Sequence, residues 1–150
     1  KLIFMERNWY LAYVDETQKC KFGRISFMDK IEYATKKEVF HLSSVTLHLK
    51  FLQNIQNSMT LYSSIPKTAR LKAVGNAVKY FNKDMKPFFR TQKFEKTLDN
   101  GDILFTVEYT QELEILPFIQ KWIPNIIVLE PISLKNKLEE HLHLLINRLN

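Results

Sequence analysis

The side chains best suited to hold a ligand are basic and aromatic residues near the amino terminus. Cations bind phosphate groups, and aromatic rings stack on bases with little sequence preference. Both kinds on one curved sheet indicate an oligonucleotide or another anion as the ligand. In a small barrel the same rings can instead form the core, and we expect Trp9 to be a core residue. Residues 4–30 contain Arg7, Lys19, Lys21, Arg24 and Lys30 together with Phe4, Trp9, Tyr10, Tyr13, Phe22 and Phe27.

The four histidines form no pattern typical of a metal site. His141 and His143 are two residues apart on an expected helix, so they point to different faces and cannot chelate one ion together. His41 and His48 have no cluster of carboxylates beside them in the sequence, and we expect both to be solvated or at an interface. The sequence therefore predicts no metal and no other cofactor.

Cys20 is the only cysteine of the chain. A single cysteine cannot close an internal disulfide, and this usage is typical of a reducing, cytoplasmic compartment. The charges of Lys19 and Lys21 could lower the pKa of the thiol and make it reactive. We favour the alternative, an unreactive cysteine in a surface turn.

The sequence contains none of the common motifs of catalysis. It has no glycine-rich phosphate loop, no nucleophile elbow and no His-Glu-x-x-His pair. Each of its three glycines, Gly23, Gly75 and Gly101, suits a bulge, an element boundary or a turn. We therefore expect no enzyme, and a small nucleic-acid enzyme is the least favoured class.

The charge of the chain is distributed unevenly. Its 150 residues include 22 Lys and Arg against 16 Asp and Glu, a net charge of +6, which favours polyanionic partners. Residues 1–98 hold 18 basic and 8 acidic side chains, whereas residues 99–150 hold 4 and 8. No apolar run reaches the roughly 18 residues that a membrane-spanning helix needs, so we expect a soluble protein without membrane contact. Because the chain starts with Lys1 in a strand-like segment, we expect a piece of a longer protein.

Short bursts of aromatic and β-branched residues in the first forty positions are typical of small twisted strands. Polar turns separate these bursts, and Gly23 suits a bulge. Successive short antiparallel strands predict a small β-barrel over residues 1–40. The expected strands are Leu2–Met5, Trp9–Val14 and Lys21–Phe27, with Ile31–Thr35 as a fourth strand or a single helical turn.

Residues 41–66 have the pattern of a connector helix followed by a linker. Apolar residues recur there at spacings of three and four, and Ser43 or Ser44 suits the N-cap. The apolar positions are Leu47, Leu49, Phe51, Leu52, Ile55 and Met59.

The remaining segment, residues 67–150, alternates strand and helix patterns in the order β-α-β-β-α-β-α. This order is that of a ferredoxin-like βαββαβ domain with one extra helix, so the fold class is α+β. Asn100 and Gly101 centre a hairpin turn, and Pro117 stands either in the first turn of its helix or at a kink. The expected strands are Thr68–Val74, Phe88–Leu98, Ile103–Tyr109 and Ile126–Leu129, and the expected helices are Ala77–Asn82, Leu113–Ile123 and Leu134–Leu149.

Several segments of the sequence resemble a known family. Arg7–Tyr13 contains Trp-Tyr-Leu at residues 9–11 and resembles the WYL domain family, and Lys21–Ile31 is similar to the family's spaced arginines that end in Asp-Arg-Ile. Three further blocks resemble the C-terminal extension domain that usually follows a WYL domain: Gly101–Val107, Glu114–Trp122 and Val128–Pro131.

The resemblance implies the sensing part of a bacterial transcriptional regulator. In this family an N-terminal winged helix-turn-helix binds promoter DNA, an Sm-like or SH3-like WYL barrel senses a ligand, and a ferredoxin-like extension supports homodimerisation. Single-stranded DNA or another nucleic-acid species is the effector of some members. On this resemblance residues 1–40 form the barrel without its first strand, and residues 67–150 form the extension domain. Residues 41–66 form the connector helix and linker between them. The helix-turn-helix is expected upstream of the present sequence.

The resemblance also points to candidate ligand-binding residues. Arg24 occupies the first of the family's spaced basic positions, and Lys30 replaces the last arginine but cannot reproduce its bidentate fork. Phe27 stands where the family commonly has an arginine, which removes a phosphate contact and adds a stacking surface. The alternative function is a protein-interaction and dimerisation module without a retained ligand. The ligand candidates are Tyr10, Arg24, Ser26 and Lys30.

Overall fold

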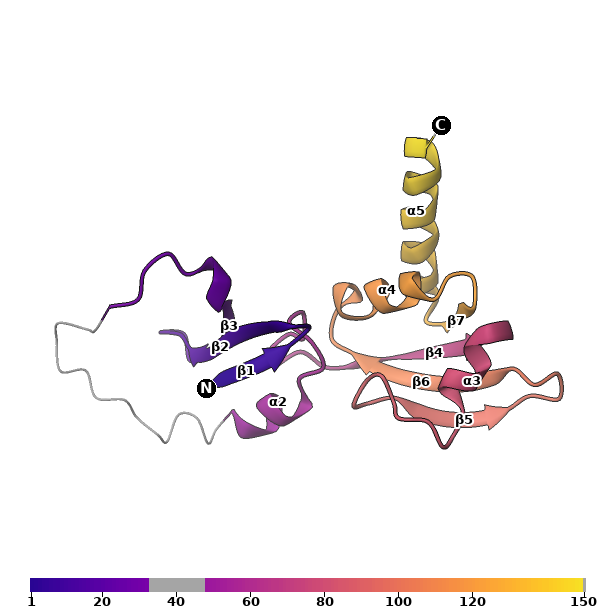
Figure 1. The fold of residues 1–150 in the computed structure, drawn as a ribbon, viewed down its shortest axis with the longest axis horizontal. Helices are drawn as coiled ribbons and strands as arrows, with labels where there is room; N and C mark the ends of the chain where they lie inside the picture. The colour runs from indigo at the N-terminus through magenta and orange to yellow at the C-terminus, as the bar shows by residue number, and fades with distance from the viewer. Residues whose placement is uncertain (33–47, 150) are drawn as a thin grey trace. The chain divides into compact units, whose positions relative to one another are not determined.

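The computed structural model describes residues 1–32 and 48–149 and is a mixed α+β structure with two antiparallel sheets. The chain divides into two compact units, Lys1–Ser63 and Ser64–Asn150 (Figure 1). In the described part of the chain, every helix is too short or too polar to cross a membrane.

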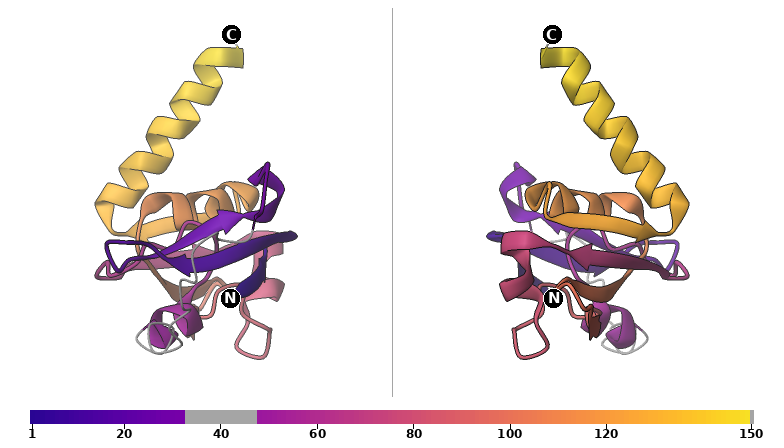
Figure 2. Two further views of the ribbon diagram at one scale, coloured as in Figure 1. Left: turned by 90° about the vertical axis from the view of Figure 1, so that its left-hand side faces the viewer. Right: turned by 90° about the vertical axis from the view of Figure 1, so that its right-hand side faces the viewer.

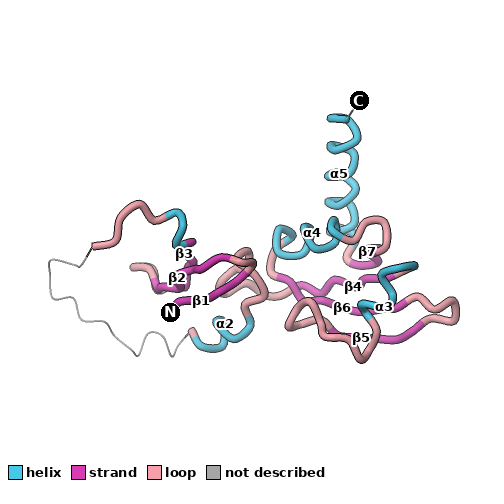
Figure 3. Tube along the Cα trace, in the orientation of Figure 1, coloured by secondary structure: helices cyan, strands magenta, loops and turns pink. Residues whose placement is uncertain are grey.

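The first unit is built on a three-stranded sheet in the order β1-β2-β3. Its strands are β1 (Leu2–Met5), β2 (Asn8–Val14) and β3 (Cys20–Arg24), followed by the 3-10 helix η1 (Ile25–Phe27) and the short helix α2 (Leu49–Asn54) (Figure 3). The prediction of β1 is confirmed at both ends, and β2 begins one residue before its expected start. Short bursts of apolar and aromatic residues between polar turns made these strands recognisable.

Alternation along β2 gives the sheet a buried face and an open face, because successive side chains of a strand point to opposite sides. Tyr10 and Ala12 are buried on the first face. Phe22 of β3 lies directly across from Ala12 and stacks on Phe51 of α2, with ring centroids 5.8 Å apart. Trp9 points to the opposite face and is exposed, so the expectation that it belongs to the core is wrong.

A two-residue loop joins β1 and β2. Met5 pairs with Asn8, and the loop residues Glu6 and Arg7 have φ values of 49° and 62°. Two successive positive φ angles define a type I′ turn, whose twist matches that of the strands it joins. Side-chain bonds help to hold this loop, because the Asn8 amide donates to the Glu6 carbonyl oxygen and the Ser58 hydroxyl donates to the Glu6 carboxylate.

The third strand is shorter than the expected Lys21–Phe27. It ends at Arg24, and η1 follows, closed by a bond from the Met28 amide to the Ile25 carbonyl at 3.1 Å. Gly23 is not a bulge, because the register between β2 and β3 continues through it. A Cβ at Gly23 would instead lie 2.9 Å from the Met28 methyl group, so glycine leaves room for Met28 against the sheet.

Part of the expected connector lies outside the described residues. This applies to the proposed caps Ser43 and Ser44, and most of the barrel segment Ile31–Thr35, expected to be a fourth strand or a helical turn, also lies outside the described residues. The helix that is described, α2, has six residues and begins after His48.

The second unit contains a four-stranded sheet in the order β5-β6-β4-β7, and all its strand pairs are antiparallel. The predicted order of elements is confirmed. The elements are β4 (Lys67–Ala73), η2 (Gly75–Ala77), α3 (Val78–Phe81), β5 (Lys93–Thr97), β6 (Ile103–Tyr109), α4 (Glu112–Lys121), β7 (Ile126–Glu130) and α5 (Ile132–Leu149).

One core joins one face of this sheet to the three helices. Leu71 of β4 and Phe105 of β6 are fully buried together with Phe81 of α3, Ile119 of α4 and Leu134 of α5. The rings of Phe81 and Phe105 stack with centroids 4.6 Å apart. All four odd-numbered residues of β6 are buried, so one face of this strand belongs to the core.

Two expectations for this unit are corrected by tertiary packing. β5 starts at Lys93, five residues after the expected start, because Phe88 and Phe89 leave the strand and pack their rings on Phe118. Pro117 is the sixth residue of α4, so the first-turn alternative is wrong, and the proline lies inside the helix. Proline deprives the Leu113 carbonyl of its helical partner, and Leu113 is exposed, so water can take that place.

The last helix packs over only half of its length. Leu134 and Leu138 are buried, whereas Leu145 and Leu149 are exposed although they belong to the same apolar stripe. Figure 2 shows the C-terminal half of α5 extending beyond the sheet of its unit. The periodicity predicted the helix, but not where its contacts end.

Candidate functional site

The strongest candidate site is centred on Arg24, the last residue of β3. Arg24 lies directly across from Tyr10 of β2, so the two side chains share the buried face of the three-stranded sheet. Its Nη2 donates a hydrogen bond of 2.5 Å to the Asn8 Oδ1. Two of the four ligand candidates, Tyr10 and Arg24, are therefore brought together.

The guanidinium group of Arg24 is also held by an aromatic ring. Its central carbon lies 4.7 Å from the centroid of the Phe27 ring, a cation-π distance. Phe27 belongs to η1, the element that directly follows β3, so the short 3-10 turn brings its ring to the arginine. Because 75% of Phe27 is exposed, the ring presents a free surface beside the cation.

Most hydrogen-bonding capacity of Arg24 is unused. A guanidinium has five N–H donors, and within the described chain the bond to Asn8 is the only one it makes. The Nε–H is buried and has no partner among the described residues. An arginine that is fixed from two sides and has further N–H donors suits an anionic group with several acceptor oxygens, such as a phosphate or a carboxylate.

The other two candidates are differently placed. Ser26 is exposed on η1 between Arg24 and Phe27 in sequence. Lys30 is exposed too, and its Nζ lies 2.5 Å from the Glu32 carboxylate, so a neighbouring charge already compensates it. Lys30 is therefore a weaker anchor for an anion than Arg24.

Asn8 was not recognised as a site residue from the sequence. It reads there as the end of a polar turn, Glu6-Arg7-Asn8. The two-residue hairpin makes it the first residue of β2 and places its amide oxygen at the Arg24 side chain. The one available signal was the loop length, because a two-residue loop after Met5 requires the strand to resume at residue 8.

Cys20 is not a surface turn residue. It opens β3 directly across from Val14 and is buried. Burial raises the pKa of the Cys20 thiol, because the thiolate is poorly solvated there. The flanking lysines therefore do not make it a reactive nucleophile.

Of the three histidines that the structure describes, His48 and His141 contact other side chains and His143 is exposed. His48 is buried, and its Nδ1 lies 2.7 Å from the Tyr62 hydroxyl, which corrects the expectation of a solvated or interface residue. His141 lies 3.2 Å from the Gln120 amide, and His143 is exposed. His41 is outside the described residues. Within residues 1–32 and 48–149, no three His, Cys, Asp or Glu side chains are close enough together to hold a metal ion.

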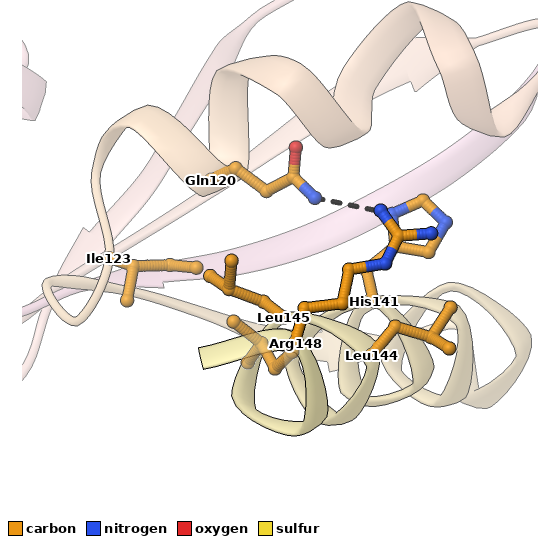
Figure 4. A pocket seen from close by; sticks show the side chains of 7 residues that line it. Gln120, Ile123, His141, Leu144, Leu145 and Arg148 are labelled. Atoms are coloured by element: carbon orange, nitrogen blue, oxygen red, sulfur yellow. Dashed lines mark hydrogen bonds between the residues drawn. The ribbon is translucent and has the colours of Figure 1, made fainter. Parts of the chain in front are cut away.

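A groove of about 600 Å³ lies in the second unit between the end of α4 and the C-terminal half of α5. Figure 4 shows Ile123 and Leu145 on one side of it, with Gln120, His141 and Arg148 close to one another on the other side. A smaller groove of about 420 Å³ lies between Glu112 and His141 on the same two helices. Both are shallow and depend on the partly packed α5, so they rank below the Arg24 site.

Comparison with known proteins adds no relative: no family model and no curated protein matches this sequence.

Proposed function

We propose that this chain is the effector-sensing and dimerisation region of a bacterial, cytoplasmic DNA-binding transcriptional regulator of the WYL type. Its effector would be a nucleic acid, a nucleotide-like molecule or another anion. The observation that carries this proposal is the Arg24 guanidinium, which Asn8 and Phe27 hold beside Tyr10 with most of its donors unused.

The chemistry of the site supports an anionic effector. A guanidinium binds phosphate or carboxylate oxygens through two parallel N–H bonds, which a lysine cannot reproduce. The Phe27 ring restricts the motion of the arginine in advance, so less side-chain entropy is lost on binding. The exposed side of that ring offers a stacking surface for a base or another flat group.

The strand arrangement supports the finer fold assignment within this proposal. We assign the second unit to the ferredoxin-like fold, because its βαββαβ order is combined with the antiparallel strand order β5-β6-β4-β7. We assign the three short antiparallel strands of the first unit to an Sm-like or SH3-like barrel. The second unit would carry the homodimer contacts, and promoter DNA would bind a helix-turn-helix outside this sequence.

Regulation would follow from a difference in effector affinity between two states. A ligand shifts an equilibrium only as far as it binds one state more tightly than the other. Effector bound at Arg24 would therefore favour one arrangement of the dimer and its DNA-binding part. No catalytic step is involved.

The alternative function is a protein-interaction and dimerisation module that has lost its ligand. Two observations favour it: the Glu32 carboxylate compensates Lys30, and the exposed Phe27 offers an apolar surface. In that case the Arg24 contacts only stabilise the end of the sheet.

Measuring how the Arg24→Ala variant binds an anion distinguishes the effector-sensing region from the interaction module without a ligand. We expect fluorescence anisotropy of a labelled single-stranded DNA decamer to show binding that weakens as salt is raised, because phosphate contacts release counterions. Arg24→Ala should weaken it roughly 10- to 100-fold, since a hydrogen bond to a charged group contributes about 1.5–3 kcal/mol. Unlabelled mononucleotide as competitor tells a nucleotide-like effector from an oligonucleotide.

Arg148→Ala is the matched control, because it removes the same charge from an exposed position of the second unit. Arg24→Lys keeps the charge and loses the fork, so it should bind with intermediate affinity. Circular dichroism checks that each variant is folded. An affinity for the decamer that does not change with salt concentration would favour the module without a ligand. So would equal losses of affinity in Arg24→Ala and Arg148→Ala.

A further inference from the structure

The open side of the three-stranded sheet carries a group of large exposed apolar side chains, which we call the aromatic face. It consists of Leu2 and Phe4 of β1 with Trp9 and Tyr13 of β2, which are 57%, 59%, 55% and 42% exposed. Leu2 lies across from Leu11, and Phe4 lies across from Trp9, so all four side chains point to the same side. Contiguous exposed apolar groups of this kind mark interaction sites.

We propose that the aromatic face is a stacking surface for single-stranded nucleic acid, separate from the Arg24 site. Tyr10 and Arg24 point to the other side of the sheet, because side chains of a strand alternate between its faces. A strand of nucleic acid on the aromatic face would therefore not contact Arg24. This second surface goes beyond the proposed effector site and does not depend on it.

The geometry of the rings suits bases. Phe4 and Trp9 form a tilted pair with centroids 5.2 Å apart and planes at 56°. Tyr13 follows Trp9 by four residues on the same strand, about 13 Å away at a rise of roughly 3.3 Å per residue. The rings thus form a row along β2 that is long enough for a few nucleotides.

Charge near the aromatic face favours a nucleic acid over a protein partner. Arg7 lies in the hairpin loop next to the Phe4–Trp9 pair, and Lys21 lies directly across from Tyr13. Asp15 binds Lys21 at 2.6 Å and partly compensates its charge, as Glu32 does for Lys30, although more than half of the Lys21 side chain is exposed. Protein interfaces exclude lysine from their centres, whereas single-strand-binding surfaces combine rings with cations.

Tryptophan fluorescence tests the proposal directly, because Trp9 and Trp122 are the only tryptophans. In a Trp122→Phe background the emission reports Trp9 alone. We expect saturable quenching on titration with single-stranded oligothymidylate of ten nucleotides, since a stacked base quenches the indole. A decamer with the same phosphates but abasic sugars should bind much more weakly and cause little quenching.

Substitution of Trp9 gives an independent measurement. Trp9→Ala should weaken oligothymidylate binding roughly 5- to 100-fold in an anisotropy assay, and Trp9→Phe should restore most of it because a ring is kept. Leu149→Ala, which also shortens an exposed apolar side chain, should leave binding unchanged. Trp9 is exposed, so these variants should keep the circular dichroism of the parent.

Three outcomes distinguish the stacking surface from the alternatives, and the first two overturn it. If the abasic decamer binds as tightly as oligothymidylate, binding depends on phosphate contacts alone and the stacking surface is wrong. If Arg24→Ala abolishes that phosphate-dependent binding, the proposed function still stands. A dimer in analytical ultracentrifugation that Trp9→Ala dissociates would show the aromatic face to be a protein interface. Trp9-dependent binding that is unchanged by Arg24→Ala is the result expected of a stacking surface separate from the Arg24 site.

Discussion

Arg24 and Lys30 have the same formal charge, but neighbouring side chains compensate the charge of Lys30 more than that of Arg24. Arg24 is fixed by an amide oxygen and a ring, neither of which is an anion, and no carboxylate of residues 1–32 or 48–149 forms an ion pair with it. Lys30 faces the Glu32 carboxylate and is widely exposed. Exposed ion pairs contribute little to stability, but they do reduce the local charge that an incoming anion meets. At the residue scale the site is therefore centred on one cation.

Asp15 stabilises the turn between β2 and β3 as an ionised side chain. Its Oδ1 accepts bonds from the Thr17 and Lys19 amides, and Lys21 binds its other oxygen. These contacts, the Lys21 bond first, hold the pKa of Asp15 far below its ordinary value of 3.8. A group with a depressed pKa in the folded state contributes stability above its unfolded pKa.

We therefore expect acid to weaken the first unit through Asp15. The stabilisation is complete above about pH 4 to 5 and is lost progressively as the pH falls below 3.8 toward the lower folded pKa. Urea unfolding monitored at Trp9 in the Trp122→Phe background should show it. Asp15→Asn keeps the shape without the charge, so the parent should be more stable than this variant at pH 7, by a margin that narrows at pH 3. A margin that is independent of pH would contradict the role of the charge.

The helix α5 shows that an amphipathic pattern does not by itself imply packing. Its apolar stripe continues to Leu149, but the last buried residue is Leu138, and the last one packed on the core is the half-buried Leu142. A helix buries its stripe only where another element lies opposite it. The exposed half has no such partner among the described residues of its unit.

Alanine substitutions along α5 should therefore have unequal effects. Leu134→Ala removes a fully buried side chain and should lower the free energy of unfolding by about 2–5 kcal/mol. Leu149→Ala changes a side chain that is 77% exposed and should have an effect within about 0.5 kcal/mol. Urea denaturation followed by circular dichroism compares the two. Similar losses in both variants would show that the end of the helix is packed in solution.

Basic and acidic residues are separated along the sequence, but in the folded second unit some of them form ion pairs. Basic residues dominate up to residue 98 and acidic residues after it, which favours a polyanion partner. Antiparallel pairing brings the two kinds together in the second unit. The ion pairs are Lys67 with Glu112, Lys72 with Asp102 and Lys93 with Glu108. Three of the nine basic side chains in residues 64–98 are thus compensated by later acidic residues, and the candidate anion sites that we describe lie in the first unit.

The two-unit organisation predicts that the second unit folds on its own. Its core cluster contains only residues between Ala69 and Leu142, all within the unit, and a domain of this size can bury enough surface for stability. A fragment of residues 64–150 should unfold in one cooperative transition and keep the near-ultraviolet circular dichroism of its aromatic cluster. A fragment without a cooperative transition would show that the first unit is needed for folding.

The order of elements could be predicted from the sequence, because periods of two and of three to four residues are local properties of strands and helices. β1 and β6 were predicted with their observed ends, since polar residues flank each strand on both sides. Arg24 was named as a ligand candidate through the resemblance to the family's spaced basic positions, whereas Asn8 was not recognised, because its contact with Arg24 spans sixteen positions. Element ends were also missed where packing draws residues away, as at Phe88 and Phe89 before β5.

Tertiary structure decided which side chains are free to act. Trp9 is exposed and Cys20 is buried, opposite to the expectation for each. Arg24 keeps unused donors while Lys30 meets a carboxylate, although both belong to one basic pattern in the sequence. The physical reason is that conformation depends mainly on neighbours along the chain, whereas burial and charge compensation depend on residues that only folding brings together.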